Sequence, residues 1–239
     1  MCVIDFHSHI LPGIDDGARN LETSLAMLDM AKAAGTDVML ATPHFYASRD
    51  RIDTFLQRRE TARDALFTAI SKEGQLAFPR IFCGAEVAYF TGIRYAKDIE
   101  MLTVENTNLL LLEMPFTPWT EENLQEVEAL LDRNFRILIA HLERFLWIPG
   151  NKKQICRLLS LPVHIQINAE AFEDNWFHTR TLIRMFQEGT AHILGSDCHG
   201  AHHRIPNLDK GRSCLMQKAG PQVLERVDRC GAELLADLL

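Results

Sequence analysis

The sequence predicts an α/β fold in which seven parallel strands and their connecting helices form a closed or distorted (β/α) barrel, with a single domain over residues 1–239. Three observations favour this fold class. Short β-rich runs alternate with helical patterns from end to end. The strand-like runs are almost continuously apolar, as expected of strands buried on both faces. No linker or repeat interrupts the alternation, and 239 residues with 47% hydrophobic content are enough for one sizeable core.

The strands are predicted from seven short apolar runs. They are "CVIDF" (2–6), "DVMLAT" (37–42), "RIFCGAE" (80–86), "NLLLLEM" (108–114), "FRILIAH" (135–141), "VHIQIN" (163–168) and "HILGSD" (192–197). A helical stretch separates most neighbouring runs, and such crossovers are typical of parallel pairing.

The helices are predicted from apolar residues at helical spacing. They lie near residues 20–34, 50–73, 121–133, 151–161 and 177–188, with a C-terminal helix from about residue 220. The apolar spacing of that last helix predicts that it docks on the rest of the fold through Val223, Leu224, Val227, Leu234 and Leu235.

Charge and composition exclude several classes of partner. The formal net charge is −7, which argues against nucleic acid or an anionic membrane recognised by bulk electrostatics. No run approaches the roughly 18 to 20 apolar residues of a membrane span, and the N-terminus lacks the pattern of a signal peptide. The six cysteines form no CxxC pair, so reduced and mostly buried thiols are expected. We therefore expect a cytoplasmic protein without membrane insertion.

Residues of metal-ligand type stand at or just after almost every predicted strand. In chain order they are His7 and His9, His44, Glu86, Glu113, His141, and Asp197 with His199, whereas "VHIQIN" ends in Asn168. In a (β/α) barrel the carboxyl ends of the strands converge on one mouth, so residues remote in sequence become neighbours. The spacings "HSH" and "DCH" place both members of each pair on one face of extended backbone.

The joint appearance of these residues indicates a metal site. A lone histidine is usually a packing residue, but many buried imidazoles and carboxylates would be costly without a cation to compensate them. A donor set without thiolate leaves manganese, iron and zinc open, and abundant carboxylate favours Mn²⁺.

Six motifs carry a resemblance to a known family. They are "DFHSHILPGIDDG", "TPHF", "GAEV", "LLEM", "HLERF" and "GSDCHG" followed by Arg204. With these motifs the chain resembles the polymerase-and-histidinol-phosphatase (PHP) superfamily, and within it the bacterial tyrosine-protein phosphatases of the capsule and exopolysaccharide type. The likeness extends to about residue 215, and "HSHILPGIDDG" combined with "HLERF" is specific. The loop after His44, "FYASRD", departs most from the family pattern, which leaves its substrate contacts open.

The resemblance implies a distorted TIM-like barrel that holds a cluster of up to three divalent metals. It implies that His7, His9, Glu86 and Asp197 hold one metal, that Glu86 bridges to a second held also by Glu113 and His141, and that Asp16, His44 and His199 lie near a third. Asp15 is expected to support the ligands or cap the loop. Arg144 and Arg204 stand where the resemblance places phosphate contacts.

These residues predict a hydrolytic mechanism. Three divalent ions among four carboxylates and five neutral imidazoles leave a positive excess, which attracts a phosphate dianion to an otherwise acidic protein. A metal-activated hydroxide is expected to attack phosphorus in line, with His199 or an ordered water protonating the leaving group. Cys198 is expected to have no catalytic role, because strand alternation turns it away from Asp197 and His199.

The remaining aromatic and histidine side chains receive weaker interpretations. Phe45, Tyr46 and Phe116 are candidates for an apolar rim around an aromatic ring, although core or loop packing explains such residues equally well. The histidines outside the ligand set are expected to be packing, exposed or supporting residues: His164, His178, His192, His202 and His203.

Three functions remain in competition at this point. The leading one is a metal-dependent phosphotyrosine phosphatase acting on a bacterial tyrosine kinase that controls polysaccharide assembly. The nearer rival is a small-molecule phosphatase of the same superfamily, such as one acting on histidinol phosphate. A non-catalytic metal-binding scaffold is the third, and a homo-oligomer is compatible with any of them.

Overall fold

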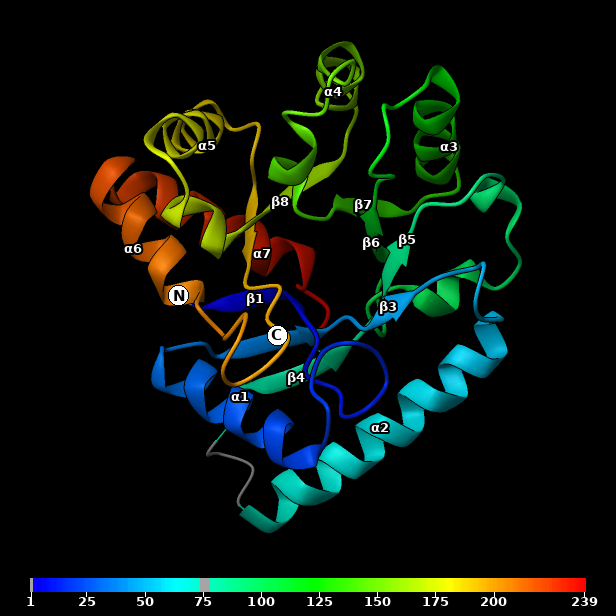
Figure 1. Ribbon diagram of the computed structural model, residues 1–239, viewed down its shortest axis with the longest axis vertical. Helices are drawn as coiled ribbons and strands as arrows, with labels where there is room; N and C mark the ends of the chain where they lie inside the picture. The colour runs from blue at the N-terminus through cyan, green and yellow to red at the C-terminus, as the bar shows by residue number, and fades with distance from the viewer. Residues whose placement is uncertain (1, 74–77) are drawn as a thin grey trace.

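The computed structural model describes residues 2–73 and 78–239 (Figure 1). In these ranges nine strands form two parallel sheets, one with the order β1-β2-β4 and one with the order β3-β5-β6-β7-β8-β9. The strands are β1 (Ile4–Ser8), β2 (Val38–Ala41), β3 (His44–Phe45), β4 (Arg80–Cys83), β5 (Glu86–Ala88), β6 (Leu109–Glu113), β7 (Arg136–Ile139), β8 (His164–Asn168) and β9 (Ile193–Gly195).

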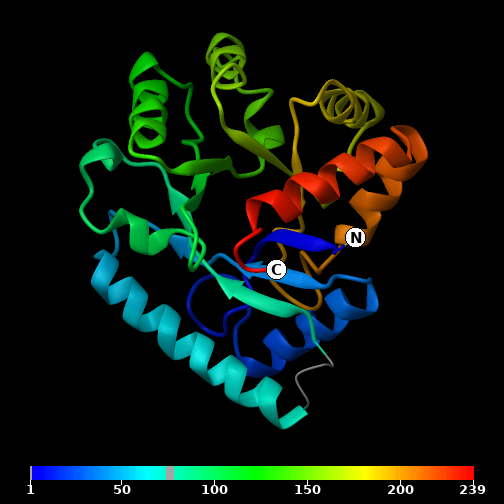
Figure 2. The ribbon, with the colours of Figure 1, turned by 180° about the vertical axis from the view of Figure 1, so that it is seen from behind.

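The helices follow the predicted alternation. They are α1 (Leu21–Ala33), α2 (Ile52–Glu73), α3 (Glu121–Asp132), α4 (Lys152–Leu158), α5 (Trp176–Glu188), α6 (Leu208–Lys218) and α7 (Pro221–Leu234), with short 3₁₀ turns η2 (Ile93–Tyr95), η3 (Ile99–Leu102), η4 (Leu142–Phe145) and η5 (Ala169–Glu173). Figures 1 and 2 show the strands curling around a central region with helices on the outside. The molecule is thus a mixed α/β fold with a curled parallel sheet in the shape of a half-barrel.

The structure has two more strands than predicted. The predicted run 80–86 covers β4 and the first residue of β5, and the short strand β3 begins just after the predicted run 37–42. Proline has no amide hydrogen for a strand ladder, and Pro43 separates β2 from β3. On the neighbouring strand Gly84 and Ala85 separate β4 from β5. Pairing continues across the break, since Glu86 N donates to the Pro43 carbonyl at 3.0 Å. Beyond it His44 pairs with Glu86, so two candidate ligands become direct neighbours.

Strand alternation separates two cores. On β6, Leu110 and Leu112 belong to the larger core, which packs against the surrounding helices, whereas Leu109 and Leu111 belong to a smaller core. Glu113 has the same parity as Leu109 and Leu111, so it continues their face at the carboxyl end of the strand. The smaller core also holds residues from β1, β2, β7 and β9, together with Leu234 and Leu235 at the C-terminus.

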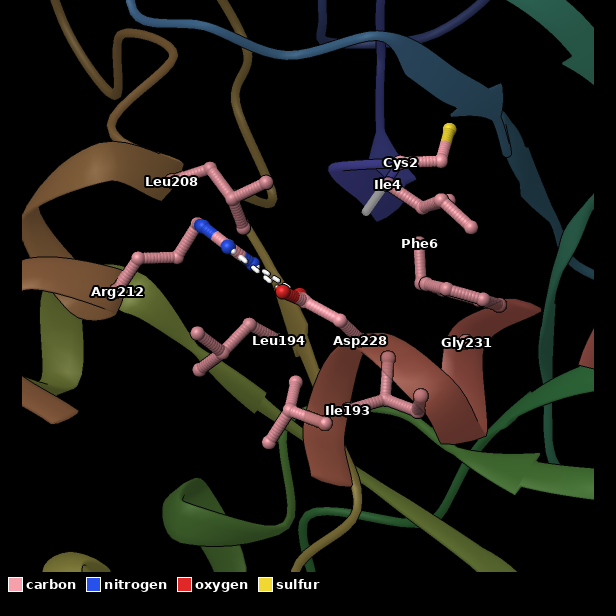
Figure 3. A pocket seen from close by; sticks show the side chains of 10 residues that line it. Cys2, Ile4, Phe6, Ile193, Leu194, Leu208, Arg212, Asp228 and Gly231 are labelled. Carbon is pink, nitrogen blue, oxygen red and sulfur yellow. Dashed lines mark hydrogen bonds and ion pairs between the residues drawn. The ribbon is translucent and has the colours of Figure 1, made fainter. Parts of the chain in front are cut away.

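Helix α7 docks as predicted, and the five apolar residues expected to anchor it are all buried. Figure 3 shows the seam where it meets α6, β1 and β9, at the amino ends of these strands. The guanidinium of Arg212 lies 3.0 Å (Nη2 to Oδ2) from the carboxylate of Asp228. The cavity there measures about 10 Å³, which is room for roughly one water molecule and identifies the seam as a packing contact.

Helix α6 is an element that the sequence interpretation missed. Its buried residues are Leu208, Gly211 and Leu215, a stripe too sparse in apolar side chains to predict a helix with certainty. A Cβ atom on Gly211 would lie 2.8 Å from the Cβ of Ala169, so glycine allows α6 to pack closely on η5.

We predict that His192, at the amino end of β9, makes stability depend on pH. Burial, with His164 and Arg226 nearby, lowers the pKa of His192 to about 4, and its Nδ1 accepts the amide hydrogen of Ile165 at 3.0 Å. The unfolded histidine protonates first, near pH 6.5, so this contribution is present above pH 6.5 and is lost as the pH falls towards 4.

The variant His192→Asn keeps an acceptor but has no titrating ring. Urea unfolding at pH 7 and pH 4.5 should show a smaller acid loss for the variant, by on the order of 1 kcal/mol at this half-buried site. An identical pH dependence in both proteins would refute the assignment.

Candidate metal centre

All nine predicted ligands meet at the carboxyl ends of the strands. They form four overlapping groups whose donor atoms lie within 4.8 Å of one another: His9, Asp16, His44 and His199; His7, His141 and Asp197; His7, His9 and Glu86; and His44, Glu86 and Glu113. Most of these side chains are buried, whereas that of Asp16 is 70% exposed. These groups overlap with the three sets that the resemblance implies but do not coincide with them, because His9 also lies with Asp16, His44 and His199, and His44 also lies beside Glu86 and Glu113.

The innermost part of the centre contains four donors around one point. Nε2 of His7 and Nε2 of His9 lie 3.1 Å apart. Oε2 of Glu86 lies 3.2 Å and 3.4 Å from these nitrogens, and Oδ1 of Asp197 lies 3.5 Å and 3.4 Å from them. Two imidazole nitrogens and two carboxylate oxygens thus gather around a common position, as ligands of one divalent cation do.

Glu86 links this position to the rest of the cluster. Its Oε1 lies 2.8 Å from Nε2 of His141, which is 3.4 Å from Glu113, and its Oε2 lies 2.7 Å from Nδ1 of His44. On the outer side Asp16 Oδ1 lies 3.4 Å from His44 and 3.5 Å from His199. Glu86 therefore stands where the resemblance implies a bridging ligand.

The chemistry of these donors fits divalent cations. His44 Nδ1 and Glu86 Oε2 approach each other without hydrogen-bond alignment, and both are buried atoms with no hydrogen-bond partner in the described part of the chain, as is His199 Nε2. Buried polar atoms are normally paired, so such a concentration of unpaired atoms is unusual. A set of imidazole and carboxylate donors suits manganese, iron or zinc.

Charge coupling within the cluster supports the same view. Burial would raise the pKa of Glu86, but His7, His141 and His44 hold it well below its ordinary value. Burial would lower the pKa of His141, but Glu113 and Glu86 raise it to about 9. Without metal, protonated imidazole therefore balances the charge of the ionised carboxylates, and a bound cation has to displace the protons from the imidazole nitrogens.

Two of the predicted ligands occupy backbone conformations that are unusual for residues with a side chain. His141 has φ 30° and Asp197 has φ 51°, both in the left-handed region. Each follows a strand, where this conformation turns the chain sharply at the mouth of the sheet. Backbone strain of this kind is concentrated at functional sites.

Asp15 contacts two of the predicted ligands and the backbone of its own loop. Its Oδ2 lies 2.8 Å from Nδ1 of His9 and accepts from the backbone N of His44 at 3.0 Å. Its Oδ1 accepts from the backbone N of Gly17 at 2.9 Å. Burial would raise the pKa of Asp15, but His9 lowers it to about 2, so the group is a carboxylate that keeps the proton of His9 on Nδ1.

We predict that Gly17→Ala disrupts this loop. A Cβ atom at Gly17 would lie 2.3 Å from the carbonyl oxygen of His9 and 2.4 Å from its Cβ, so the loop that carries Asp15 and Asp16 would have to move. Overpacking of this kind should destabilise the metal-free protein by about 1–3 kcal/mol, measured by urea unfolding, and weaken metal binding as well. Wild-type values for both would contradict the described packing.

Arg144, in η4, and Arg204, in the segment after β9, both contact Asp197. The Nη2 atom of each lies 2.6 Å from Oδ2 of Asp197, and about a third of each side chain is exposed. Arg144 also reaches Glu170 at 3.4 Å. Two partly exposed guanidinium groups that share one carboxylate oxygen can turn part of their donors towards an incoming anion.

The structure does not support His199 as the proton donor for a leaving group. Its Nδ1 lies 2.9 Å from the carbonyl oxygen of Asp197, which can only accept, so the ring proton is on Nδ1. Burial and the nearby His9 lower the pKa of His199 to about 4, so the ring is neutral at pH 7. Its free Nε2 faces Asp16 and suits a metal ligand instead.

Two further expectations about the mouth have different outcomes. The prediction that Phe45 lies at the rim was wrong, because its side chain is 1% exposed and packs on Phe55 in the core. Tyr46 lies beside His44, and Phe116 is exposed above His141 with a centroid distance of 6.3 Å. Cys198 is fully buried, and burial raises the pKa of its thiol, so it is not a nucleophile.

The other cysteines and histidines lie outside the cluster. All six cysteines carry free thiols, but only Cys83 and Cys198 among them are fully buried, so the expectation of mostly buried thiols was wrong. His164 and His192 face each other at the amino ends of β8 and β9. His178 stacks on Trp147, and His202 and His203 are exposed.

The fold and this cluster define the class: an α/β protein with a candidate site for several divalent cations at the mouth of a curled parallel sheet. The family model described as capsular polysaccharide synthesis, CpsB/CapC, matches residues 3–235. The chain belongs to this CpsB/CapC family.

Its relatives include named phosphatases. The tyrosine-protein phosphatase CpsB of Streptococcus pneumoniae is 25% identical over 232 residues, which cover 91% of each chain. The tyrosine-protein phosphatase YwqE of Bacillus subtilis (strain 168) is 26% identical over 227 residues, which cover 92% of this chain and 87% of YwqE.

The fold also matches a solved structure from the work on YwqE of Bacillus subtilis and CpsB of Streptococcus pneumoniae, described as unique metal-dependent tyrosine phosphatases. The match has a TM-score of 0.84 and 22% identity, and it covers 99% of this chain and 96% of the other. It supports the curled α/β architecture derived above. Among the described residues no helix has the length and apolar character needed to cross a membrane.

Proposed function

We propose that this chain is a metal-dependent protein-tyrosine phosphatase, a phosphoric monoester hydrolase that releases phosphate from phosphotyrosine. The observation that carries the proposal is the convergence of nine imidazole and carboxylate donors beneath two arginines. The names of the relatives at 25% and 26% identity support the same activity and a role in capsule or exopolysaccharide synthesis.

The proposed ligands are the nine residues His7, His9, Asp16, His44, Glu86, Glu113, His141, Asp197 and His199. Mn²⁺ is the proposed metal because carboxylates are numerous and thiolates are absent from the ligand set. When bound, such cations polarise a phosphoryl group and lower the pKa of a water molecule enough to make it a nucleophile near neutral pH.

The arginines are proposed to bind the phosphoryl oxygens. Arg144 and Arg204 already meet at Asp197, and among the described residues their ion pairs all involve Nη2, so their other N–H groups can turn towards an anion that arrives from solvent. A guanidinium can hold two phosphoryl oxygens at once and stabilise the charge that develops in the transition state.

A phenolic leaving group suits this site. A tyrosine phenol has an ordinary pKa near 10, so it departs with much less protonation than an alkyl alcohol requires. This agrees with a neutral His199 that offers no proton on Nε2. A cleft of about 520 Å³ that includes Asp16, His44, Tyr46 and Arg49 opens beside the cluster and can accept an aromatic ring.

The finer sequence expectations remain part of the proposal. The substrate protein is proposed to be a bacterial tyrosine kinase of polysaccharide assembly, and the compartment is proposed to be the cytoplasm. A distorted seven-stranded barrel is supported by the isolated bridge between Ser8 and Cys198, which brings the end of β1 to the segment after β9.

The proposal is tested by comparing two substrates after metal removal. Chelator-treated protein should hydrolyse neither substrate, and added Mn²⁺ should restore turnover of a phosphotyrosine peptide well above that of histidinol phosphate. Preference for histidinol phosphate would favour a small-molecule phosphatase. Bound metal without hydrolysis of any aryl phosphate would favour a scaffold.

A further inference from the structure

Strand β8 carries none of the proposed ligands, yet two of its side chains reach into the ligand cluster. Gln166 and Asn168 are fully buried and lie two residues apart, so they share one face of the strand. That face continues towards the mouth, where the other strands place their ligands. The sequence had left "VHIQIN" as the one predicted strand that ends without a residue of the metal-binding set.

The two amides form a continuous chain of hydrogen bonds between ligands. Oε1 of Gln166 lies 2.8 Å from the backbone N of His141 and 3.2 Å from Nδ1 of His7. Nε2 of Gln166 donates to Oδ1 of Asn168 at 2.7 Å, and Nδ2 of Asn168 donates to Oδ2 of Asp197 at 2.9 Å.

The direction of this chain is fixed at its two ends. The backbone N–H of His141 can only donate, so the Gln166 atom that faces it must be the carbonyl oxygen. Gln166 must then donate its amide hydrogens to Asn168, and Asn168 must donate its own to the carboxylate of Asp197. Since Oε1 of Gln166 can only accept, Nδ1 of His7 must carry a proton, which leaves Nε2, the nitrogen that faces His9 and Glu86, as the one that can offer a lone pair to a cation.

The backbone of β9 packs closely against the side chains of Gln166 and His7. A Cβ atom on Gly195 of β9 would lie 2.8 Å from Nε2 of Gln166 and 2.8 Å from Cβ of His7. Glycine at this position therefore allows β9 to close over the amide. His141 and Asp197, the two predicted ligands with left-handed backbone, lie at the two ends of this series of hydrogen bonds.

We propose that Gln166 and Asn168 are positioning residues that fix the proton of His7 on Nδ1, hold the backbone of His141 and orient the carboxylate of Asp197. This inference rests on the proposed metal-dependent function. Partners of this kind around ligands typically account for about ten- to a hundred-fold in metal affinity. Neither amide is a ligand itself, because its donor atoms are already used.

The test uses Zn²⁺ alone and variants of similar shape. Gln166→Met removes the acceptor of His7 and the donor to Asn168. Asn168→Leu removes the donor to Asp197 and the acceptor of Gln166 Nε2, and it leaves the contact between Gln166 Oε1 and His7 in place. Asn151→Leu is the matched control, because Asn151 is also fully buried and binds Trp119 N and Phe145 O, away from the nine ligands. Zn²⁺ affinity is measured by competition with a chelator, and urea unfolding of the metal-free proteins is measured alongside.

Gln166→Met and Asn168→Leu should each weaken Zn²⁺ binding by about ten-fold or more, while Asn151→Leu should lose stability and keep its Zn²⁺ affinity. In Zn²⁺-loaded protein labelled with ¹⁵N-histidine, the slowly exchanging Nδ1–H signal of His7 should be present in the wild type and Asn168→Leu, and lost in Gln166→Met. If Gln166→Met does not fold, the Zn²⁺ affinity of Asn168→Leu still tests the proposal.

Wild-type Zn²⁺ affinity in both variants, or a His7 Nδ1–H signal unaffected by Gln166→Met, would overturn the positioning role and leave phosphatase activity as proposed. Weakened Zn²⁺ binding in a protein that hydrolyses no aryl phosphate would instead reject the proposed function and keep the positioning role. A wild-type protein that binds no Zn²⁺ would reject both.

Discussion

His141→Ala should abolish hydrolysis of an aryl phosphate while the protein stays folded. Nε2 of His141 lies 2.8 Å from Oε1 of Glu86 and 3.4 Å from Oε1 of Glu113, so the variant removes a proposed ligand that these two carboxylates share. Losing one cation removes several kcal/mol of transition-state stabilisation, which corresponds to about a thousand-fold or more in kcat/KM. The measurement is steady-state hydrolysis of para-nitrophenyl phosphate with added Mn²⁺, together with metal content per chain.

The matched control for this variant is His164→Ala. His164 is a half-buried histidine at the amino end of β8, far from the mouth, and burial with Arg136 nearby lowers its pKa. It should keep the wild-type metal content and turnover. Unchanged activity in His141→Ala, or equal loss in both variants, would contradict the assignment of the centre.

Arg144→Ala should lower kcat/KM for an aryl phosphate by about a hundred-fold or more, with metal content close to wild type. The guanidinium lies 2.6 Å from Asp197 and faces the same opening as Arg204, so it is placed to bind a phosphoryl oxygen that arrives above the cluster. A loss of this size is typical when one charge-stabilising donor is removed from a transition state.

Arg144→Lys separates charge from geometry. Lysine keeps the positive charge but cannot bind two oxygens in a fork, so it should recover only part of the lost kcat/KM. Arg157→Ala is the control, because Arg157 pairs with Glu128 at 2.8 Å on the outer surface. If Arg144→Ala loses its metal and its activity together, Arg144 supports Asp197 rather than the substrate.

The sequence was most informative where a strand ended in a polar residue. The seven predicted strands all exist, and the predicted ligands that follow them converge as the barrel geometry predicted. Glu113 illustrates the reason: strand alternation puts it on the face of Leu109 and Leu111, and parallel pairing brings all strand ends to one edge.

The failures have equally local causes. The predicted run 80–86 continues across the break at Gly84, so apolar content did not reveal that break, and the predicted run 37–42 stopped before the short strand β3 that follows Pro43. Phe45 was expected at the rim, but alternation on β3 turns it into the core while His44 faces the cluster. The groups of donor atoms also overlap more than the three implied sets, since His9 lies with Asp16, His44 and His199 as well as with His7 and Glu86.

Gln166 and Asn168 were missed because their chemistry is not that of ligands. A signal was nevertheless present: "HIQIN" spaces two amides at the strand period on the one strand without a ligand. Amides that alternate with isoleucine on a buried strand must find partners, because unpaired buried amides are costly.

The most direct test of the account is the relation between bound metal and turnover. Chelator-treated protein is loaded stepwise with Mn²⁺, the metal content is measured by mass spectrometry, and hydrolysis of a phosphotyrosine peptide is followed at each step. Activity should be absent at zero metal and should rise with loading until more than one ion is bound per chain. Full activity in the metal-free protein, or saturation without any bound ion, would contradict the central claim.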